Sequence, residues 1–497
     1  MTRRAGILAP VSTLGGAHGI GDFGKSAYEF VDLIKKAGFK VWQILPLNPV
    51  GYGNSPYQPY SSYAGDEIYI SLELLVEWGL LKSEEIDEYL EEGSSIDYPK
   101  VRSFKETYLH MAFERCMETG IERDGFHYFK EKHPWLFNYA AFITLKKKHD
   151  LKCWLEWPVE EQEWPDTYQY DIEQHRPQLE YEMFVQYVFY RQWFDLKKYA
   201  NEAGIEIVGD IPIYVGIDSA DVWTNKKCFL LDEKYNPTYV AGVPPDYFSK
   251  TGQRWGNPIY DWEYLKETDF QFWIDRLIWS TFLFDIVRID HFRGFDTYWK
   301  IPVSCPTAEI GEWVEAPGYE LFDMINKKIP DIHIVAEDLG DLREEVFELR
   351  DHYGLSGMKI VQFELDPYES NNDFKETQNT IVYTGTHDNQ TLVGWYKNLS
   401  SYQKRKISQK FKKYKERKCT DRIIHAVFNS VADLVIFPVQ DLLALDDAAR
   451  INTPGTVGSP NWEWRLTSFD ELKTVLPVYK KLIQKSKRKG NNLTIPN

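Results

Sequence analysis

Eight short apolar segments, separated by stretches long enough to form crossover connections, constrain the fold of this chain more than any other feature. Patterns typical of helices lie between them, for example over residues 25–37 and 181–203. Parallel strands need such crossovers, and eight of them can close into a barrel surrounded by helices. We therefore predict strands over residues 5–10, 41–47, 205–212, 284–291, 332–337, 358–364, 380–384 and 433–439.

Two intervals between these segments are too long for a single crossover helix. Over approximately residues 48–180, which are rich in Glu, Lys, Trp and Tyr, we predict a mostly helical insertion. Over residues 216–264 we predict a loop-rich insertion. Each follows a strand, so both rise over the C-terminal rim of the barrel. There is no internal repeat and no Ser/Gly linker. We therefore expect one α/β domain over residues 1–497, a (β/α)8 TIM barrel with these two insertions.

Acidic residues follow three of the apolar segments. Asp290 ends one of them, Glu337 ends the next, and Asp388 comes shortly after a third. In a parallel barrel the functional groups gather at the C-terminal rim, so these three carboxylates should converge on one cleft. Without a clear set of metal ligands, they favour acid–base and nucleophilic chemistry. Glycoside cleavage is the leading candidate.

The neighbours of these acids suggest different ionisation states. Side chains alternate along a strand, so Arg288 and Asp290 lie on one face. We expect the guanidinium to lower the pKa of Asp290, as a nucleophile requires. Glu337 has no basic neighbour in the sequence and follows an apolar strand. Burial should therefore raise its pKa, as a general acid requires.

The charge and composition narrow the range of partners. The formal charge is −17, from 58 Lys and Arg against 75 Asp and Glu, which argues against nucleic acid or an anionic membrane surface as partner. The basic run over residues 404–418 has apolar residues at helical spacing, so we predict a solvated outer helix there. Aromatic residues make up 15% of the chain, including 17 tryptophans, and such rings suit the surfaces of sugars.

Signals for cofactors, metals and secretion are weak. The five cysteines show no Cys-x-x-Cys pair, which argues against a disulfide framework or a zinc site. Residues 19–24 match the Gly-x-Gly-x-x-Gly pattern, but the next strand lacks the acidic residue that would bind a ribose. We expect no cofactor. There is no signal peptide and no apolar run of membrane-spanning length, so we expect a cytoplasmic protein, or an organelle protein in its mature form.

Several motifs, taken together and in order, resemble those of a known family. The chain is similar to the amylomaltases, which are 4-α-glucanotransferases or disproportionating enzymes related to the α-amylase clan. The resemblance runs nearly from end to end. It rests on residues 19–24 (GIGDFG), 55–62 (SPYQPYSS), 209–215 (GDIPIYV), 242–248 (GVPPDYF), 252–258 (GQRWGNP), 288–292 (RIDHF), 336–340 (AEDLG) and 386–389 (THDN).

The resemblance implies a role for each residue. It makes Asp290 the nucleophile, Glu337 the general acid/base and Asp388 the stabiliser of the transition state. Asp210 could instead be a structural acid of a turn, and the histidines could be structural too. The substrates implied are α-1,4-glucans and maltooligosaccharides, bound by a monomer or weak homodimer. The residues implied to bind them are Tyr57, Asp210, Tyr247, Phe248, Gln253, Trp255, Arg288, His291 and His387.

The predicted reaction is a double displacement with retention of configuration. An α-glucan hydrolase would use the same acids with water as acceptor. The choice of transfer depends on the loop over residues 244–257, whose aromatic side chains could hold an acceptor sugar and exclude water. A catalytically silent glucan-binding protein is the other alternative. The intact set of acids argues against it, because binding alone needs no nucleophile beside a protonated acid.

Overall fold

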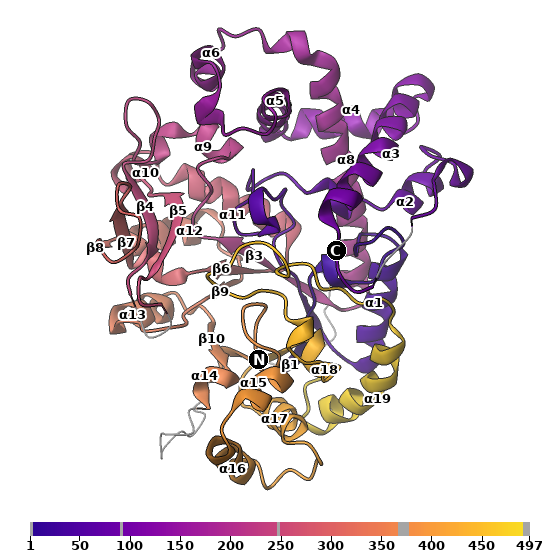
Figure 1. Cartoon of the computed structure of the whole chain (residues 1–497), viewed down its shortest axis with the longest axis vertical. Coiled ribbons are helices and arrows are strands. Elements are labelled where there is room, and N and C mark those ends of the chain that lie inside the picture. The colour runs from indigo at the N-terminus through magenta and orange to yellow at the C-terminus, as the bar shows by residue number, and fades with distance from the viewer. Residues whose placement is uncertain (1–2, 90–92, 246–248, 366–376, 491–497) are drawn as a thin grey trace.

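Eight parallel strands form a barrel at the centre of the molecule (Figure 1). The structure is a computed structural model that describes residues 3–89, 93–245, 249–365 and 377–490. The strand order is β10-β11-β12-β1-β2-β3-β6-β9. Val335 of β9 forms a parallel bridge with Ser356, which leads into β10, and this contact closes the ring. The strands are β1 (Arg4–Leu8), β2 (Val41–Gln43), β3 (Glu206–Pro212), β6 (Ile286–Asp290), β9 (Ile334–Ala336), β10 (Gly357–Ile360), β11 (Thr380–Tyr383) and β12 (Leu434–Pro438).

The interior of the barrel is apolar towards the N-terminal ends of the strands and polar towards their C-terminal ends. Side chains at alternate positions of a strand share a face, so the position two residues beyond an inward apolar residue also points inward. On β3 that position is Asp210, and on β6 it is Arg288. The polar groups therefore stand above a closed apolar floor. That floor consists of Leu8, Val41, Val208, Ile286, Val335, Met358, Ile360, Ile381, Leu434 and Ile436, all buried.

Helices surround the barrel and cover the outward faces of its strands. In α1 (Lys25–Ala37) the buried residues recur at helical spacing, and Gly38, with φ 92°, ends the helix in the left-handed conformation. The predicted helix over residues 25–37 is confirmed. The other outer helices are α8 (Arg176–Glu202), α10 (Trp262–Glu267), α11 (Gln271–Leu283), α12 (Gly318–Lys328), α13 (Glu344–His352), α15 (Leu392–Asn398), α16 (Ser401–Lys410), α17 (Cys419–Phe428) and α19 (Asp470–Lys485). Two short helices, α14 (Val361–Glu364) and α18 (Val439–Leu442), begin directly at the C-terminal ends of β10 and β12.

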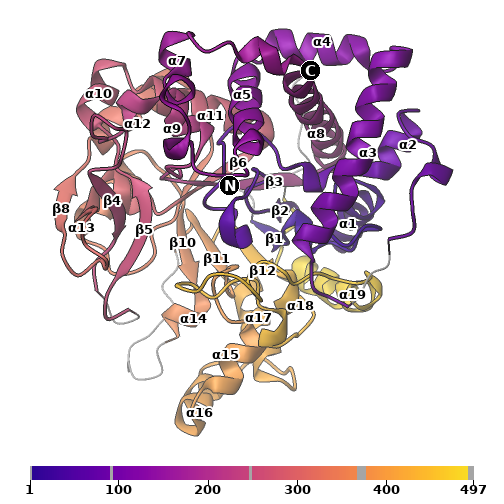
Figure 2. The ribbon, with the colours of Figure 1, turned by 45° about the horizontal axis from the view of Figure 1, so that its top comes forward.

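The chain between β2 and α8 forms a helical layer at the top of the view in Figure 1 and Figure 2. Its longest helices, α3 and α5, pack on α8, which returns the chain to the barrel. This layer therefore rests on the barrel through the same helix that leads into β3. Its helices are α2 (Leu72–Glu77), α3 (Tyr98–Thr119), α4 (Arg123–Lys132), α5 (Trp135–Lys148), α6 (Val159–Gln162) and α7 (Trp164–Thr167).

A four-stranded antiparallel sheet lies beside the barrel, at the left of Figure 1. The segment over residues 216–264, expected to be loop-rich, contains α9 (Ala220–Thr224), β4 (Tyr239–Val243) and β5 (Gln253–Pro258). These strands pair in the order β5-β4-β7-β8 with two strands that the sequence did not lead us to expect. They are β7 (Thr297–Pro302) and β8 (Glu312–Glu315). This sheet gives the second excursion from the barrel a fixed shape.

The eight predicted barrel strands are all present, but some are shorter than predicted. The strand predicted over residues 41–47 ends at Gln43, and the one over 358–364 ends at Ile360, where α14 begins. Apolar residues continue past these strand ends because the loops at the rim are also buried. The basic run over 404–418 is helical only as far as Lys410. In the described part of the chain, no helix is both long and apolar enough to cross a membrane.

Candidate active site

Arg288 joins the carboxylates of Asp210 and Asp290 inside the barrel. Its Nη1 donates to Oδ1 and Oδ2 of Asp210 at 2.7 and 2.6 Å, and its Nη2 donates to Oδ1 of Asp290 at 2.9 Å. Strand β3 pairs with β6 in a register that sets Asp210 opposite Arg288. This contact between strands, together with alternation along β6, places all three groups on the inner face of the barrel.

Asp210 lies beneath the cleft rather than on its surface. Its side chain is fully buried, and besides Arg288 it accepts a hydrogen bond from the hydroxyl of Tyr57 at 2.7 Å. Its carboxylate therefore holds the guanidinium on one side and the phenol on the other. The Asp290 side chain is 32% exposed, so the nucleophile predicted from the sequence does reach the open cleft.

The prediction that Arg288 would lower the pKa of Asp290 below its ordinary value is wrong in its net direction. Burial is the largest influence and raises this pKa. Arg288 lowers it as expected, but the nearby carboxylates of Asp210 and Asp388 raise it again. Neighbours in the sequence revealed the arginine, whereas the desolvation and the two other acids come from the folded barrel.

Glu337 carries the raised pKa that was predicted for it. Desolvation and the negative charge of Asp290 raise its pKa to about 7. Two backbone N–H groups oppose this increase: Leu339 donates to Oε1 at 3.0 Å and His291 donates to Oε2 at 2.8 Å. Glu337 therefore keeps its proton to a higher pH than an ordinary glutamate does.

His291 and Trp255 form one wall next to these acids. Their rings meet edge to face, with centroids 4.8 Å apart. Desolvation, together with the positive charge of Arg293, lowers the pKa of His291 to about 4, so its imidazole is neutral at pH 7. Trp255 lies on β5, where its Nε1 donates to Oε1 of Gln253 at 3.2 Å. The antiparallel sheet thus brings two predicted sugar-binding residues next to the barrel.

His387 and Tyr57 form a second aromatic wall, beside Asp388 and Asp210. Their rings stack with centroids 5.2 Å apart and an angle of 15° between the planes. Trp462 packs against both rings, at 6.1 Å from Tyr57 and 5.9 Å from His387. His387 is buried, and its Nε2 lies 3.4 Å from Oδ1 of Asp388. These contacts bring together segments of the chain that are some 330 and 400 residues apart in sequence.

Two residues that the sequence did not single out hold Asp388. Asn452 donates its Nδ2 to Oδ1 of Asp388 at 2.7 Å, and Arg450 donates its Nη2 to the Asp388 carbonyl at 2.7 Å. Nothing in the local sequence marks these residues. The stretch Asn452-Thr453-Pro454-Gly455 indicates only a turn. Tyr247 and Phe248, which were predicted to bind sugar, lie outside the described residues.

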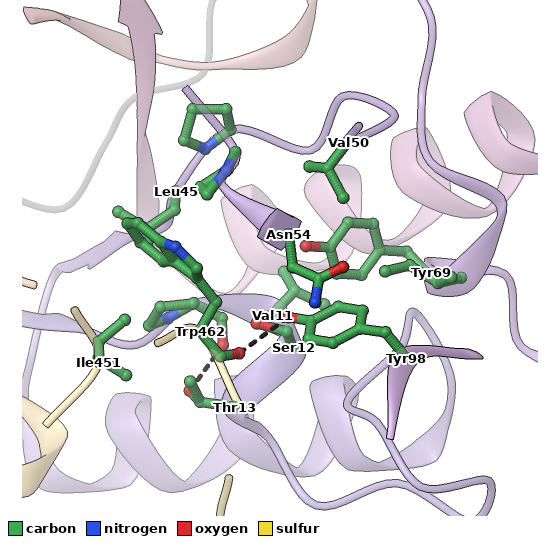
Figure 3. Close-up of a pocket in the computed structure, with 14 residues that line it drawn as sticks. Val11, Ser12, Thr13, Leu45, Val50, Asn54, Tyr69, Tyr98, Ile451 and Trp462 are labelled. Carbon is green, nitrogen blue, oxygen red and sulfur yellow. Dashed lines mark hydrogen bonds between the residues drawn. The ribbon is translucent and has the colours of Figure 1, made fainter. Parts of the chain in front are cut away.

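Figure 3 shows a hollow beside this site. Trp462 lines it from one side, and the hydroxyl of Tyr98 donates to the Trp462 carbonyl at 2.8 Å. Of the three predicted acids, none lines this hollow. Because Trp462 also packs on His387 and Tyr57, the hollow lies next to this second wall.

Comparisons with known proteins agree on one family. A family model described as 4-alpha-glucanotransferase matches residues 9–471. The 4-alpha-glucanotransferase of Streptococcus pneumoniae (TIGR4 strain) is 43% identical over 483 residues, which cover 95% of this chain and 94% of that protein. The 4-alpha-glucanotransferase of Thermus thermophilus is 42% identical, over 94% of this chain and 95% of that protein.

A solved structure gives the same result. The amylomaltase from Streptococcus agalactiae, in complex with acarbose, superposes with a TM-score of 0.93 at 36% sequence identity. The match covers 98% of this chain and 100% of that one. The agreement therefore includes the barrel, the helical layer and the antiparallel sheet together.

Proposed function

The chain belongs to the 4-alpha-glucanotransferase family, and we propose that Asp290, Glu337 and Asp388 carry out the transfer by a retaining double displacement. One observation carries this assignment. A carboxyl group with a pKa of about 7, Glu337, lies beside a carboxylate held by Arg288, Asp290. An acid able to keep its proton near neutral pH, next to a carboxylate paired with an arginine, is the arrangement that retaining glycoside chemistry requires.

In the first step, Asp290 attacks the anomeric carbon of the donor glucan. The glycosidic bond breaks, and its oxygen takes the proton of Glu337, so the reducing-end segment leaves as an alcohol. The product is a glycosyl ester on Asp290. The upward shift in the pKa of Glu337 supports this role, because a proton must be present there near neutral pH.

In the second step, the ionised Glu337 takes the proton from the 4-hydroxyl of an acceptor glucan. The acceptor oxygen attacks the same carbon and displaces Asp290, which restores both carboxyl groups to their starting states. Because two inversions follow one another, the α configuration is kept. Neither electrons nor groups other than the sugar are exchanged, so the residues of the chain are sufficient.

The walls of the cleft would bind the sugar that is transferred. His291 is neutral and half-buried, so its ring can form hydrogen bonds with hydroxyl groups without bringing a charge. Tyr57, stacked on His387, presents an aromatic surface suited to the apolar face of a sugar ring. Trp255 and Gln253 would contact the sugar from the sheet side. Asp210 would act indirectly, by holding Arg288 and Tyr57.

The substrates we propose are α-1,4-glucans and maltooligosaccharides, and the setting is the cytoplasm, with the enzyme as a monomer or weak homodimer. The test is incubation with maltotriose. A transferase yields glucose and a ladder of longer maltooligosaccharides while the total of reducing ends stays constant. If reducing ends increase in step with the bonds broken, the protein is a hydrolase. If no product forms, it is a binding protein.

A further inference from the structure

The chain beyond η9 (Asp447–Ala449) runs along the loop that carries Asp388. Asn452 Nδ2 donates to Asp388 Oδ1 at 2.7 Å, and Arg450 Nη2 donates to the Asp388 carbonyl at 2.7 Å. We propose that Asn452 and Arg450 are positioning residues that determine which carboxylate oxygen of Asp388 faces the sugar. This inference rests on the role proposed above for Asp388.

The two oxygens of Asp388 lie in different surroundings. Oδ1 accepts the hydrogen bond from Asn452 and lies 3.4 Å from Nε2 of His387. Among the residues that the structure describes, none donates a hydrogen bond to Oδ2. The Asp388 side chain is 45% exposed, so without a fixed partner it would sample several rotamers in the open cleft. Asn452 selects one of them and leaves Oδ2 for the sugar.

Arg450 fixes Asn452 relative to Asp388. While Nη2 of Arg450 binds the Asp388 carbonyl, its Nε donates to the Asn452 carbonyl at 2.7 Å. The planar guanidinium therefore bridges both backbones, and an ammonium group lacks this rigid fork. A fourth hydrogen bond runs from the Asn452 backbone N–H to the His387 carbonyl at 3.1 Å. The two segments are thus joined at both main chains and side chains.

The same segment supports the aromatic wall. Trp462 donates its backbone N–H to the carbonyl of Ile451, which lies between Arg450 and Asn452, at 2.7 Å. The Trp462 ring packs against His387. One stretch of chain, residues 450–452, therefore holds the main chain around His387 and Asp388 as well as the Asp388 side chain. A change at the Asn452 side chain leaves the main-chain contacts in place.

The main test is Asn452→Asp, which keeps the shape of the side chain and replaces the donor with a second carboxylate. The new carboxylate repels that of Asp388 and cannot donate the hydrogen bond, so it turns Asp388 away from the sugar. We expect kcat on maltotriose to fall about 10- to 100-fold, with little change in KM. A residue that only maintained the loop would instead change stability, or kcat and KM together.

Two further variants separate the contributions. Asn452→Ala removes the donor without adding charge, so kcat should fall while KM changes little. Arg450→Lys keeps a positive charge but loses the fork, and should lower kcat by a smaller factor. The matched control is Asn429→Asp, an exposed asparagine at the end of α17 that should leave the activity unchanged. Circular dichroism checks that each variant is folded.

Comparison with Asp388→Asn distinguishes the possible failures. If Asp388→Asn keeps the parent rate, the role proposed for Asp388 is wrong. If Asp388→Asn is slow but Asn452→Asp and Asn452→Ala behave like Asn429→Asp, the positioning role is wrong. Adding Asn452→Ala to Asp388→Asn should cause no further loss, because both act through one carboxylate. Losses that multiply would mean that Asn452 acts elsewhere, and would overturn the inference.

Discussion

The backbone N–H of His291 donates to Oε2 of Glu337 at 2.8 Å, so the residue that follows Asp290 holds the carboxyl group of Glu337. His291 has φ 55°, in the left-handed region that few residues other than glycine adopt. This conformation turns the chain at the end of β6 and aims the N–H across to the strand that carries Glu337. The position of Glu337 relative to Asp290 therefore depends on the backbone.

The first prediction concerns the basic limb of the pH profile. In the mechanism proposed above, Glu337 must be protonated in the first step, and its pKa is about 7. We expect kcat/KM for maltotriose to fall about tenfold for each pH unit well above 7, with the midpoint close to that value. The midpoint belongs to the coupled pair with Asp290 rather than to one residue. A profile that stays flat from pH 7 to 9 would contradict the assignment of Glu337 as the acid.

The sequence was sufficient to predict the barrel because strand alternation and apolar segments are local properties. It placed Arg288 and Asp290 on one face, and the structure confirms that they are in contact. Contacts between residues far apart in the sequence could not be predicted. Asn452 lies 64 residues from Asp388 along the chain. The pKa of Asp290 depends on burial and on acids from other strands, so its direction could not be predicted from the arginine alone.

The antiparallel sheet is a second feature that could not be predicted from the sequence. Residues 253–258 read as a loop because the run contains Gly256 and Pro258, yet they form an outer strand of the sheet. Outer strands tolerate such residues, since one edge needs no partner. The pairing of β4 with β7 depends on a strand that lies after β6, some 60 residues further along the chain. Local patterns do not carry that information.

The second prediction concerns stability. The folded pKa of Glu337 is above the ordinary value for Glu, so its contribution to stability is complete below about pH 4 and is lost as pH rises to about 7. Glu337→Gln cannot ionise and avoids this loss. The free energy of unfolding of the variant, relative to the parent, should rise between pH 4.5 and 8 by roughly 1–3 kcal/mol. Urea unfolding at both pH values measures it.

Glu202→Gln is the matched control for this experiment, because Glu202 is exposed at the end of α8 and its side chain lies 4.0 Å from Lys198. Its stability relative to the parent should be nearly the same at both pH values. If Glu337→Gln behaves like Glu202→Gln, the half-buried carboxyl of Glu337 is not ionising with a raised pKa, and its proposed role as the acid loses its physical basis.

The third prediction concerns the rates of variants of the acids. Asp290→Asn removes the proposed nucleophile and Glu337→Gln removes the proposed proton donor, so each should reduce kcat roughly 10³-fold or more. The double variant should be little slower than the slower single variant, because the two groups act in one step. For Asp388→Asn we expect the loss mainly in kcat. A change confined to KM would make Asp388 a binding residue.

The last prediction concerns Asp210, which is fully buried beneath the cleft and binds both Arg288 and Tyr57. Asp210→Asn leaves the buried guanidinium with Asp290 as its remaining carboxylate partner among the described residues. Breaking a buried ion pair costs roughly 3–5 kcal/mol. Tyr57→Phe removes a single hydrogen bond to a charged group and should cost about 1.5–3 kcal/mol. We therefore expect Asp210→Asn to reduce the free energy of unfolding more than Tyr57→Phe does.

Asp210→Asn should also lower kcat, because Arg288 loses the group that orients it towards Asp290. Urea unfolding and maltotriose kinetics of both variants check this, and equal stability losses would mean that Asp210 serves the phenol rather than the guanidinium.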